Sequence, residues 1–367
     1  MRKLAYISLV MIILLVVVFT GCSKKIPEGA LASMATKSAP VMDGMVDDVW
    51  DDAPALVVDV YVPEYPVFDS SYFKDSYNVS MQSLHTDTDI YFLYQWTGDK
   101  EESQARQSWY YNTDAGKWMQ KPKYKDDGYY GPEYEDKFAV IWEIGDSIDG
   151  FAENGCAILC HGEKKATNAE GETADIWHWK SDRTGPVNQI DDKWLGFSDG
   201  NGRHGDEGTG AYSSNSQELT DAAGNTVKVP VYWVPGATDY HWIMDGDKNA
   251  RKIVSIDADG NLVDEDGTVL VKEKFNGDSN IQIPSIYNIK PGTGGRGDVT
   301  EYHNYDKATG TWTLEVKRAL DTGNVDDVDF SDPEREYYFS IAVFDAAAIA
   351  HAIPGGMSGT AYPLVIR

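Results

Sequence analysis

Cysteine is scarce in this sequence, which has three cysteines among 367 residues. A small fold stapled by many disulfides is therefore excluded. Basic residues are also few, since 32 lysines and arginines stand against 59 acidic residues, for a net charge of −27 at pH 7. Such a surface repels nucleic acid and anionic lipid, and it suits a partner with a basic surface. Because the acidic residues are spread along the chain, we expect them to form a solvated surface.

Catalytic signatures are missing as well. The sequence has no Ser-His-Asp pattern, no zinc-protease motif and no phosphate-binding loop. It therefore predicts a protein that is not an enzyme, although its many Asp and Glu residues leave a pair of catalytic carboxylates as an alternative.

Long apolar runs are absent apart from residues 4–19, which follow two basic residues. This run has the length of a signal-peptide core and is short for a membrane-spanning helix. Small residues then lead into Cys22, a pattern similar to a bacterial lipobox. We expect residues 1–21 to be a cleaved signal peptide, Cys22 to carry lipid, and residues 22–39 to tether the chain to a membrane; the alternative is an uncleaved anchor helix. The folded part is then extracytoplasmic, and Lys24 favours the periplasmic face of the outer membrane or the cell surface.

Aromatic and turn-forming residues are plentiful, with 22 Tyr, 11 Trp, 34 Gly and 15 Pro. They indicate many strands joined by turns. The segments with the composition or alternation of strands are 90–96, 138–144, 229–234, 311–317, 338–344 and 362–366. In the fourth of these, Trp312, Leu314 and Val316 are expected to face one side. No long helical periodicity is present, so the sequence predicts an all-β antiparallel sandwich over residues 40–367.

Two turn-rich stretches, near residues 162–228 and 245–280, are expected to be long loop insertions into the sandwich. The second contains Asp257 and Asp264, each at the start of a short Asp- and Gly-rich run that invites a calcium loop as one reading. An EF-hand loop needs glycine at its sixth position, which here is Leu262. Two hairpin turns are therefore favoured.

The most informative motif is Cys156-Ala-Ile-Leu-Cys160-His161. Covalent c-type haem uses two thiols for attachment and a histidine directly after the second thiol as an iron ligand. The usual spacer between the cysteines is two residues, and here it is three. The pattern favours haem c, attached at Cys156 and Cys160 and ligated by His161. A Cys156–Cys160 disulfide, a zinc site and a pair of buried thiols are the alternatives.

Several segments around this motif are similar to one known family. They are residues 134–142, 151–156, 175–180, 191–192, 312–323 and 326–330. In combination they resemble the ethylbenzene-dehydrogenase-related haem-binding family, also described as the cytochrome c-552/DMSO-reductase-like haem-binding domain, over roughly residues 40–366. Residues 43–50 resemble the opening of family-9 carbohydrate-binding modules, which share the sandwich fold.

The resemblance implies a β-sandwich that holds one haem and transfers electrons to a redox partner, such as another cytochrome or an oxidoreductase. The best-known relatives are small subunits of molybdenum dehydrogenases, which hold haem b through Met and Lys without thioether bonds. This chain differs from them in its Cys-Cys-His motif, its size and its lipobox. These differences favour covalent haem c, with haem b in a molybdenum dehydrogenase-like complex as the alternative.

Other candidate haem contacts lie far from the motif in sequence. His178 and Lys180, in a Trp-His-Trp-Lys segment, are expected beside the haem. The distal iron ligand is expected to be His351 or His85, because both lie near strand ends where a sandwich can open. For each of them, a surface or hydrogen-bonding role is the alternative. His351 is favoured, since its Ala- and Gly-rich loop can approach a flat porphyrin closely. The thioether alternatives are Met81 and Met357.

The sequence thus predicts a membrane-tethered cytochrome. The alternative from another functional class is a glycan- or ligand-binding sandwich in which Cys156 and Cys160 form a disulfide. Aromatic residues such as Trp109, Tyr110 and Tyr111 would then stack on sugar rings.

Overall fold

The computed structural model describes residues 25–63, 76–98, 105–122, 134–160, 165–237, 239–277 and 281–367. Cys22, with the expected signal peptide, and His161 lie outside these residues, as does the side chain of Cys160. Strands dominate the described chain, and its two α-helices are single turns, α1 (Phe151–Asn154) and α2 (Ala157–Cys160). The expected all-β fold class is confirmed. None of the described helices has the length and apolar character needed to span a membrane.

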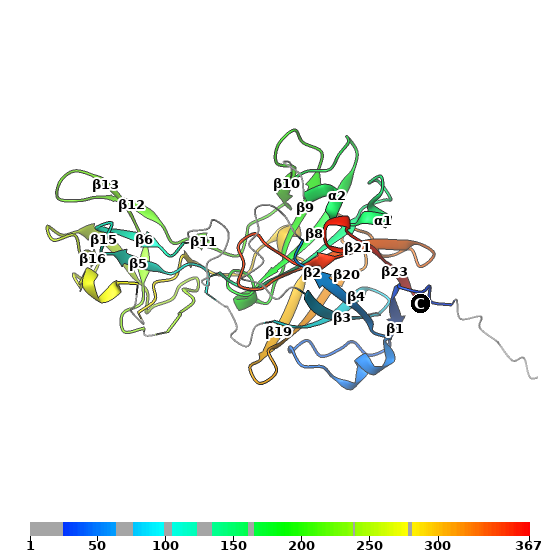
Figure 1. Cartoon of the computed structure of the whole chain (residues 1–367). Helices are drawn as coiled ribbons and strands as arrows, with labels where there is room; N and C mark the ends of the chain where they lie inside the picture. The colour runs from blue at the N-terminus through cyan, green and yellow to red at the C-terminus, as the bar shows by residue number, and fades with distance from the viewer. Residues whose placement is uncertain are drawn as a thin grey trace, which may run out of the picture.

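In the described part of the chain, one sheet of 13 strands forms the body of the molecule (Figure 1). Its main path runs β10-β9-β8-β7-β21-β23-β1-β3-β4-β20-β19, with β2 beside β3 and β22 beside β2. The bounds are β1 (Leu31–Ala35), β2 (Leu56–Tyr61), β3 (Ser76–His85), β4 (Asp89–Thr97), β7 (Lys137–Glu143), β8 (Thr173–Lys180), β9 (Asp191–Gly196), β10 (Arg203–Gly205), β19 (Thr300–Asp306), β20 (Thr311–Ala319), β21 (Glu336–Phe344), β22 (Ile353–Pro354) and β23 (Tyr362–Ile366). Neighbouring strands are antiparallel except at β1, which pairs in parallel with β23 and β3.

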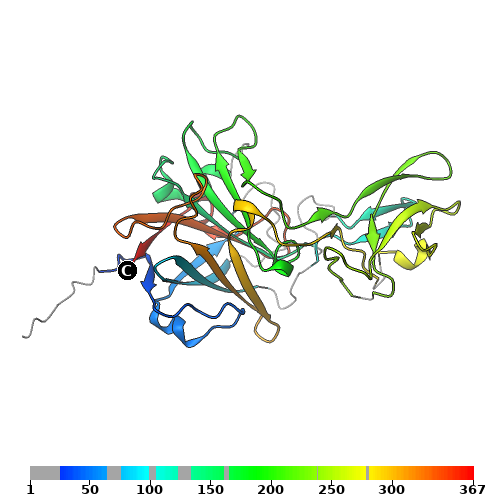
Figure 2. The same cartoon turned by 180° about the vertical axis from the view of Figure 1, so that it is seen from behind.

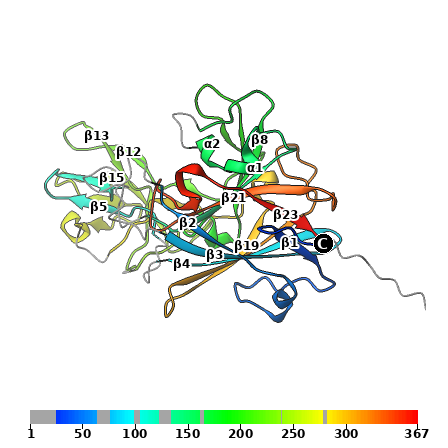
Figure 3. The ribbon, with the colours of Figure 1, turned by 45° about the vertical axis from the view of Figure 1, so that its right-hand side comes forward.

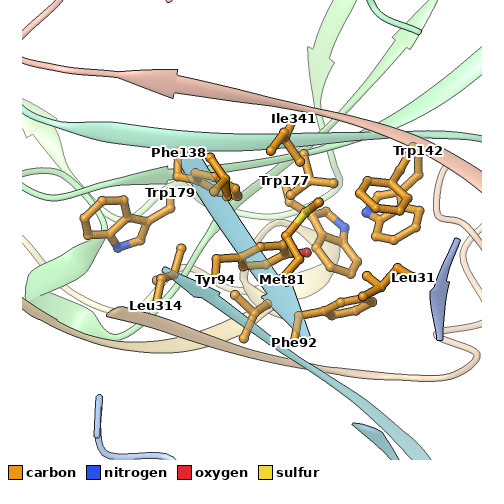
Figure 4. Packing of buried hydrophobic residues seen from close by; sticks show 14 of the residues in the cluster. Leu31, Met81, Phe92, Tyr94, Phe138, Trp142, Trp177, Trp179, Leu314 and Ile341 are labelled. Atoms are coloured by element: carbon orange, nitrogen blue, oxygen red, sulfur yellow. The ribbon is translucent and has the colours of Figure 1, made fainter. Parts of the chain in front are cut away.

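The two halves of this sheet, joined through β1, pack face to face as a sandwich. One layer contains β7, β8 and β21, and the other contains β3, β4 and β20. Large aromatic side chains fill the space between the layers (Figure 4). The ring centroid of Phe92, on β4, lies 5.5 Å from that of Trp142 on β7 and 5.6 Å from that of Trp177 on β8. Aromatic ring contacts stabilise a fold by more than the apolar area that they bury, and they have preferred geometries. This cluster therefore fixes how the two layers face each other.

Strand β20 shows how the sequence pattern directs this packing. Trp312, Leu314 and Val316 all face the core, as expected. Glu315 points to the opposite face and is also fully buried, because the N-terminal segment that carries Trp50 covers it. The indole Nε1 of Trp50 donates to Glu315 Oε1 at 3.1 Å. The carboxylate therefore anchors the start of the domain to the outside of the sandwich.

A second, smaller lobe combines two separate stretches of the chain, residues 109–120 and 217–275, and lies at one end of the body (Figure 2). Its strands are β5 (Trp109–Asn112), β6 (Lys117–Gln120), β12 (Gln217–Thr220), β13 (Thr226–Val229), β14 (Tyr232–Trp233), β15 (Arg251–Ile256), β16 (Leu262–Asp264) and β17 (Val269–Leu270). The short pair β11 (Ser213–Ser214) and β18 (Ile286–Tyr287) leads into it. The described 3-10 helices are η1 (Asp48–Asp52), η3 (Gly185–Val187), η4 (Lys272–Phe275), η5 (Gly294–Gly297) and η6 (Gly356–Ser358).

The stretch expected as one insertion near residues 162–228 divides between the two parts. Strands β8, β9 and β10 fall within it and belong to the large sheet. The polar composition suggested a loop here because residues such as Asp175 and Asp192 lie on the strands themselves. Residues 245–280 lie in the lobe. There the turns that begin at Asp257 and Asp264 join β15 to β16 and β16 to β17, as the expected hairpins.

Candidate functional site

Cys156 lies at the corner between α1 and α2, which rest on the outer face of β21 and β8 (Figure 3). The thiol is buried there, with 7% of the residue exposed. Gly155 makes this close approach possible. Its φ is 55° and its ψ is −144°, and a Cβ at this position would lie 2.5 Å from the backbone oxygen of Thr360. Only glycine allows the corner to press so closely against the chain.

The sheet face beside Cys156 is apolar. Strand alternation turns Ala139 and Ile141 of β7, Ile176 of β8 and Ala342 of β21 away from the aromatic core and toward this face. Ala139 and Ala342 pair in register on neighbouring strands. Because an alanine side chain ends at Cβ, the two leave a low, flat floor.

His178 continues this row on β8, in register with Ala139. Its Nδ1 lies 2.6 Å from a guanidinium nitrogen of Arg203. A guanidinium can only donate, so Nδ1 accepts and the neutral ring carries its hydrogen on Nε2. Burial lowers the pKa of His178 well below its usual value, and Lys180 lowers it further. Nε2 is buried and has no hydrogen-bond partner among the described residues, so this part of the structure holds a neutral imidazole with an unused N–H donor.

Phe344, at the end of β21, lies between His178 and His351. The ring centroid of Phe344 is 5.7 Å from that of His178 and 4.7 Å from that of His351, and both pairs are stacked. Nδ1 of His351 lies 2.7 Å from the carbonyl oxygen of Ile349 and donates to it. This bond places the lone pair of the neutral His351 ring on Nε2. The structure therefore brings two of the predicted histidines to the face that holds Cys156.

Lys180 was expected beside the haem, and it is buried on the same face. Its ammonium group forms a salt bridge with Asp191. Lys193 and Arg296 also pair with Asp191, at 3.1 and 2.8 Å. Burial alone would raise the pKa of Asp191, but Lys180 and Lys193 hold it below its usual value. Lys180 is thus held in an ion-pair group and contributes positive charge to the site.

Lys137 is a second buried lysine at this end of the face, in register with Lys180. Its Nζ donates to the carbonyl oxygen of Ala348 at 3.0 Å and lies 4.1 Å from the ring centroid of Phe344. Burial lowers the pKa of Lys137 well below its usual value, and the nearby cation Arg183 adds to this. Lys137 and Arg203, the partner of His178, were not among the site residues predicted from the sequence. The available signal was a charged residue directly before an apolar strand.

The face therefore has an apolar end and a cationic end. The apolar end holds Cys156 and the alanine floor, and the cationic end holds Lys137, Lys180, Arg203 and His178. A haem is a flat apolar ring with vinyl groups on one side and propionates on the other. An apolar floor accommodates such a ring, and the buried N–H of His178 suits a carboxylate acceptor. The described residues thus fit a haem.

The sequence matches the profile of the family described as ethylbenzene dehydrogenase over residues 47–353. The chain belongs to this family. Among solved structures it is similar to a family-9 carbohydrate-binding module from Caldicellulosiruptor kristjanssonii in complex with cellotriose, at 10% identity and a TM-score of 0.32, covering 92% of this chain and 94% of that chain. The same kind of module in complex with glucose matches at 8% identity and a TM-score of 0.30, covering 92% and 95%. A search of curated proteins finds no match.

In this member of the ethylbenzene dehydrogenase family, the other predicted ligands lie in different places. His85 ends β3 in the opposite layer, where its Nδ1 lies 3.2 Å from Ser33 Oγ and burial lowers its pKa. Met81 is fully buried in the core between the layers. Met357 is 47% exposed and belongs to η6, which packs against α2. Of these three residues, only Met357 lies beside the corner that carries Cys156.

The aromatic residues considered for sugar stacking lie in the smaller lobe of this family member. Trp109 is buried, and its Nε1 donates to the carbonyl oxygen of Asn215 at 2.8 Å. Tyr110 and Tyr111 are half-buried, and Tyr111 packs edge-on against the buried Trp118 at a centroid distance of 5.8 Å. The contacts of Trp109 and Tyr111 are those of core packing.

Proposed function

We propose that this chain is a lipid-anchored c-type cytochrome that carries one haem and transfers electrons outside the cytoplasm. The observation that carries the proposal is one sheet face with Cys156 at its apolar end and the unused N–H of His178 at its cationic end. Membership of the ethylbenzene dehydrogenase family and the Cys156, Cys160 and His161 motif support the same reading. The haem would supply reversible one-electron chemistry, and no other reaction is proposed for the chain.

Each side chain has a distinct task under this proposal. Cys156 and Cys160 would hold the haem through thioether bonds, and His161 would be an iron ligand. The N–H of His178 donates to a propionate, and Lys137 supplies compensating charge. His178 would then gain an acceptor, which its Nε2 lacks among the described residues, and Lys137 would gain an anionic neighbour in addition to Glu135.

The second iron ligand is proposed to come from the same face. His351 is favoured, because its Nδ1–H bond to a backbone carbonyl fixes the ring and places the lone pair on Nε2. Met357 is the alternative, because η6 packs against α2. A fixed pair of ligands limits rearrangement of the iron when it changes charge, which suits an electron carrier.

The location of the protein is also part of the proposal. Cys22 would carry the lipid, and the redox partner would be a protein with a basic surface, since the chain has a net charge of −27. The expected result for Cys22→Ala is a precursor that is neither cleaved nor acylated. Mass spectrometry of the mature wild-type protein that finds another N-terminus, without acyl mass, contradicts this part.

Haem b is the second candidate cofactor, favoured by family membership and by the same face. An apolar floor with a cationic end also suits a haem without thioether bonds. The chain would then be a haem subunit of a molybdenum dehydrogenase-like complex.

A denaturing gel separates these candidates. The full chain is exported from cells that contain the c-type haem maturation machinery, and the gel is stained for haem peroxidase activity. Wild type should keep its haem, and Cys156→Ser or Cys160→Ser should lose most of the stain. Ile158→Val, between the two cysteines, is the matched control and should stain like wild type. Loss of all haem from denatured wild type favours haem b, and purified protein without any haem refutes both candidates.

A further inference from the structure

Three aspartates from distant parts of the sequence meet on the side of β8 opposite to His178. Asp175 lies on β8, Asp192 on β9, and Asp327 in the connection between β20 and β21. One carboxylate oxygen from each lies within 4.8 Å of the others. All three residues are buried, with 0 to 4% exposed. None of them has a task in the proposed haem site.

In the described part of the chain, each of these carboxylates has one oxygen that accepts from protein donors and one that accepts from none. Oδ2 of Asp175 accepts from an indole N–H and a backbone N–H, each at 3.1 Å, while its Oδ1 has no hydrogen-bond partner. Oδ1 of Asp192 accepts from a backbone N–H at 2.9 Å, and its Oδ2 has none. Oδ2 of Asp327 accepts from a hydroxyl at 2.5 Å and an amide at 3.1 Å, and its Oδ1 has none. Fully buried carboxylate oxygens without a donor are costly and call for a ligand.

Asp206, directly after β10, adds a fourth buried carboxylate. Among the described residues neither of its oxygens has a hydrogen-bond partner. Burial raises the pKa of Asp206 to about 8, and the negative charges of Asp175 and Asp327 contribute. For these aspartates the expectation of a solvated acidic surface is wrong, because the fold turns them inward.

Positive charge in contact with the cluster is insufficient. The buried guanidinium of Arg318 donates to Asp175 Oδ2 at 2.8 Å. Among the described residues, Arg296 also interacts electrostatically with Asp206, and Asp298 adds a further carboxyl beside Asp192 and Asp327. These two guanidinium groups face five carboxyl groups, which leaves an excess of buried negative charge. Burial and the neighbouring Asp175 raise the pKa of Asp192 well above its usual value. The cluster must therefore take up either protons or a metal cation.

We propose that Asp175, Asp192 and Asp327 bind a calcium ion, with Asp206 as a further ligand or charge partner. The donors are all carboxylate oxygens, which hard divalent cations prefer. Two calcium ligands at about 2.4 Å from the ion lie at most about 4.8 Å apart, and the three oxygens satisfy this limit. Magnesium demands a smaller and more regular octahedron. The ion joins β8, β9 and the β20–β21 connection, and so supports from behind the strand that carries His178.

Terbium(III), a luminescent substitute for calcium, gives a direct binding test on the mature full-length protein in detergent. The indole of Trp177 donates to Asp175, so a bound terbium ion lies close enough to be excited through this indole. After calcium has been removed with EGTA, added terbium should luminesce on excitation of tryptophan, and calcium should quench the signal by displacement. Calcium chloride should also raise Tm relative to EGTA, and magnesium chloride at the same concentration should raise it less.

Asp192→Asn tests the site itself, and Asp114→Asn, in the exposed turn between β5 and β6, is the matched control. Asp192→Asn should lose the terbium signal and the rise in Tm with calcium. In EGTA it should melt at or above the wild-type Tm, because a buried negative charge has been removed. A residue with a merely structural role would lower Tm equally in both buffers.

The wild-type measurements alone can overturn the proposal. If wild type shows no terbium signal and the same Tm in calcium and in EGTA, the cluster holds protons and no calcium. If Asp192→Asn keeps the full calcium response, the ion binds elsewhere. Neither result depends on whether the protein carries a haem.

Discussion

Replacing Gly155 by alanine perturbs the corner that positions Cys156. The backbone at Gly155 has φ 55° and ψ −144°, a conformation that costs other residues about 1–3 kcal/mol. The new Cβ would also lie 2.5 Å from the oxygen and 2.8 Å from the carbon of the Thr360 carbonyl. Overpacking of this kind costs about 1–3 kcal/mol. We therefore expect Gly155→Ala to lower the free energy of unfolding by about 2–6 kcal/mol, or to move the corner away from residue 360.

Gly150→Ala is the matched control for this experiment. Gly150 is the N-cap residue of α1 and has a φ of 79°, but the nearest atom to an added Cβ would be 3.5 Å away. The free energy of unfolding of Gly150→Ala should fall only by the cost of placing alanine in a left-handed conformation, about 1–2 kcal/mol. The assays are urea unfolding followed by tryptophan fluorescence and the haem content per polypeptide. Gly155→Ala should lose more stability and carry less haem than Gly150→Ala. Equal stability and equal haem content in the two variants refute the role assigned to the corner.

Three further predictions concern the sandwich, the cationic end and the iron. Glu315→Gln leaves at least one of the N–H donors that now bind the carboxylate without an acceptor. Urea unfolding should therefore show a free energy of unfolding lower by about 2–3 kcal/mol, and the control Glu218→Gln, at an exposed position, should show no loss. Lys137→Met should stabilise the haem-free protein, because the folded wild type binds the proton of the Lys137 ammonium group less tightly than the unfolded chain does. The gain in the free energy of unfolding should shrink as pH rises toward the usual lysine pKa of about 10.4. A gain that is independent of pH contradicts the lowered pKa of Lys137. His351→Ala should convert a low-spin haem spectrum to a high-spin spectrum while the haem stays attached, and Met357→Ala should stay low-spin. If Met357→Ala becomes high-spin and His351→Ala stays low-spin, Met357 is the distal ligand.

The strands with strong local patterns could be predicted from the sequence. Segments 90–96, 311–317, 338–344 and 362–366 all lie within strands of the large sheet. Their alternation or dense apolar composition reports directly on burial, so the sandwich class followed from local information. Residues 229–234 were predicted as one strand, but they contain the end of β13 and the whole of β14, which Pro230 separates.

Features that depend on distant segments meeting could not be predicted. The smaller lobe combines residues 109–120 with residues 217–275, and neither stretch can bury its aromatic side chains alone. Asp175 and Asp327 are far apart in the sequence and share one cluster. In the candidate haem site, the sequence identified Cys156 and His178 by type, but their common sheet face and the neighbouring Lys137 follow only from strand register.

The most direct test of the central claim is the pyridine haemochrome spectrum of the mature protein, recorded before and after acid–acetone extraction. We predict one haem per polypeptide that shows the α band of a haem bound through thioethers and stays with the protein on extraction. A haem b spectrum that leaves with the acetone contradicts covalent attachment, and protein exported with the maturation machinery that contains no haem contradicts the account altogether.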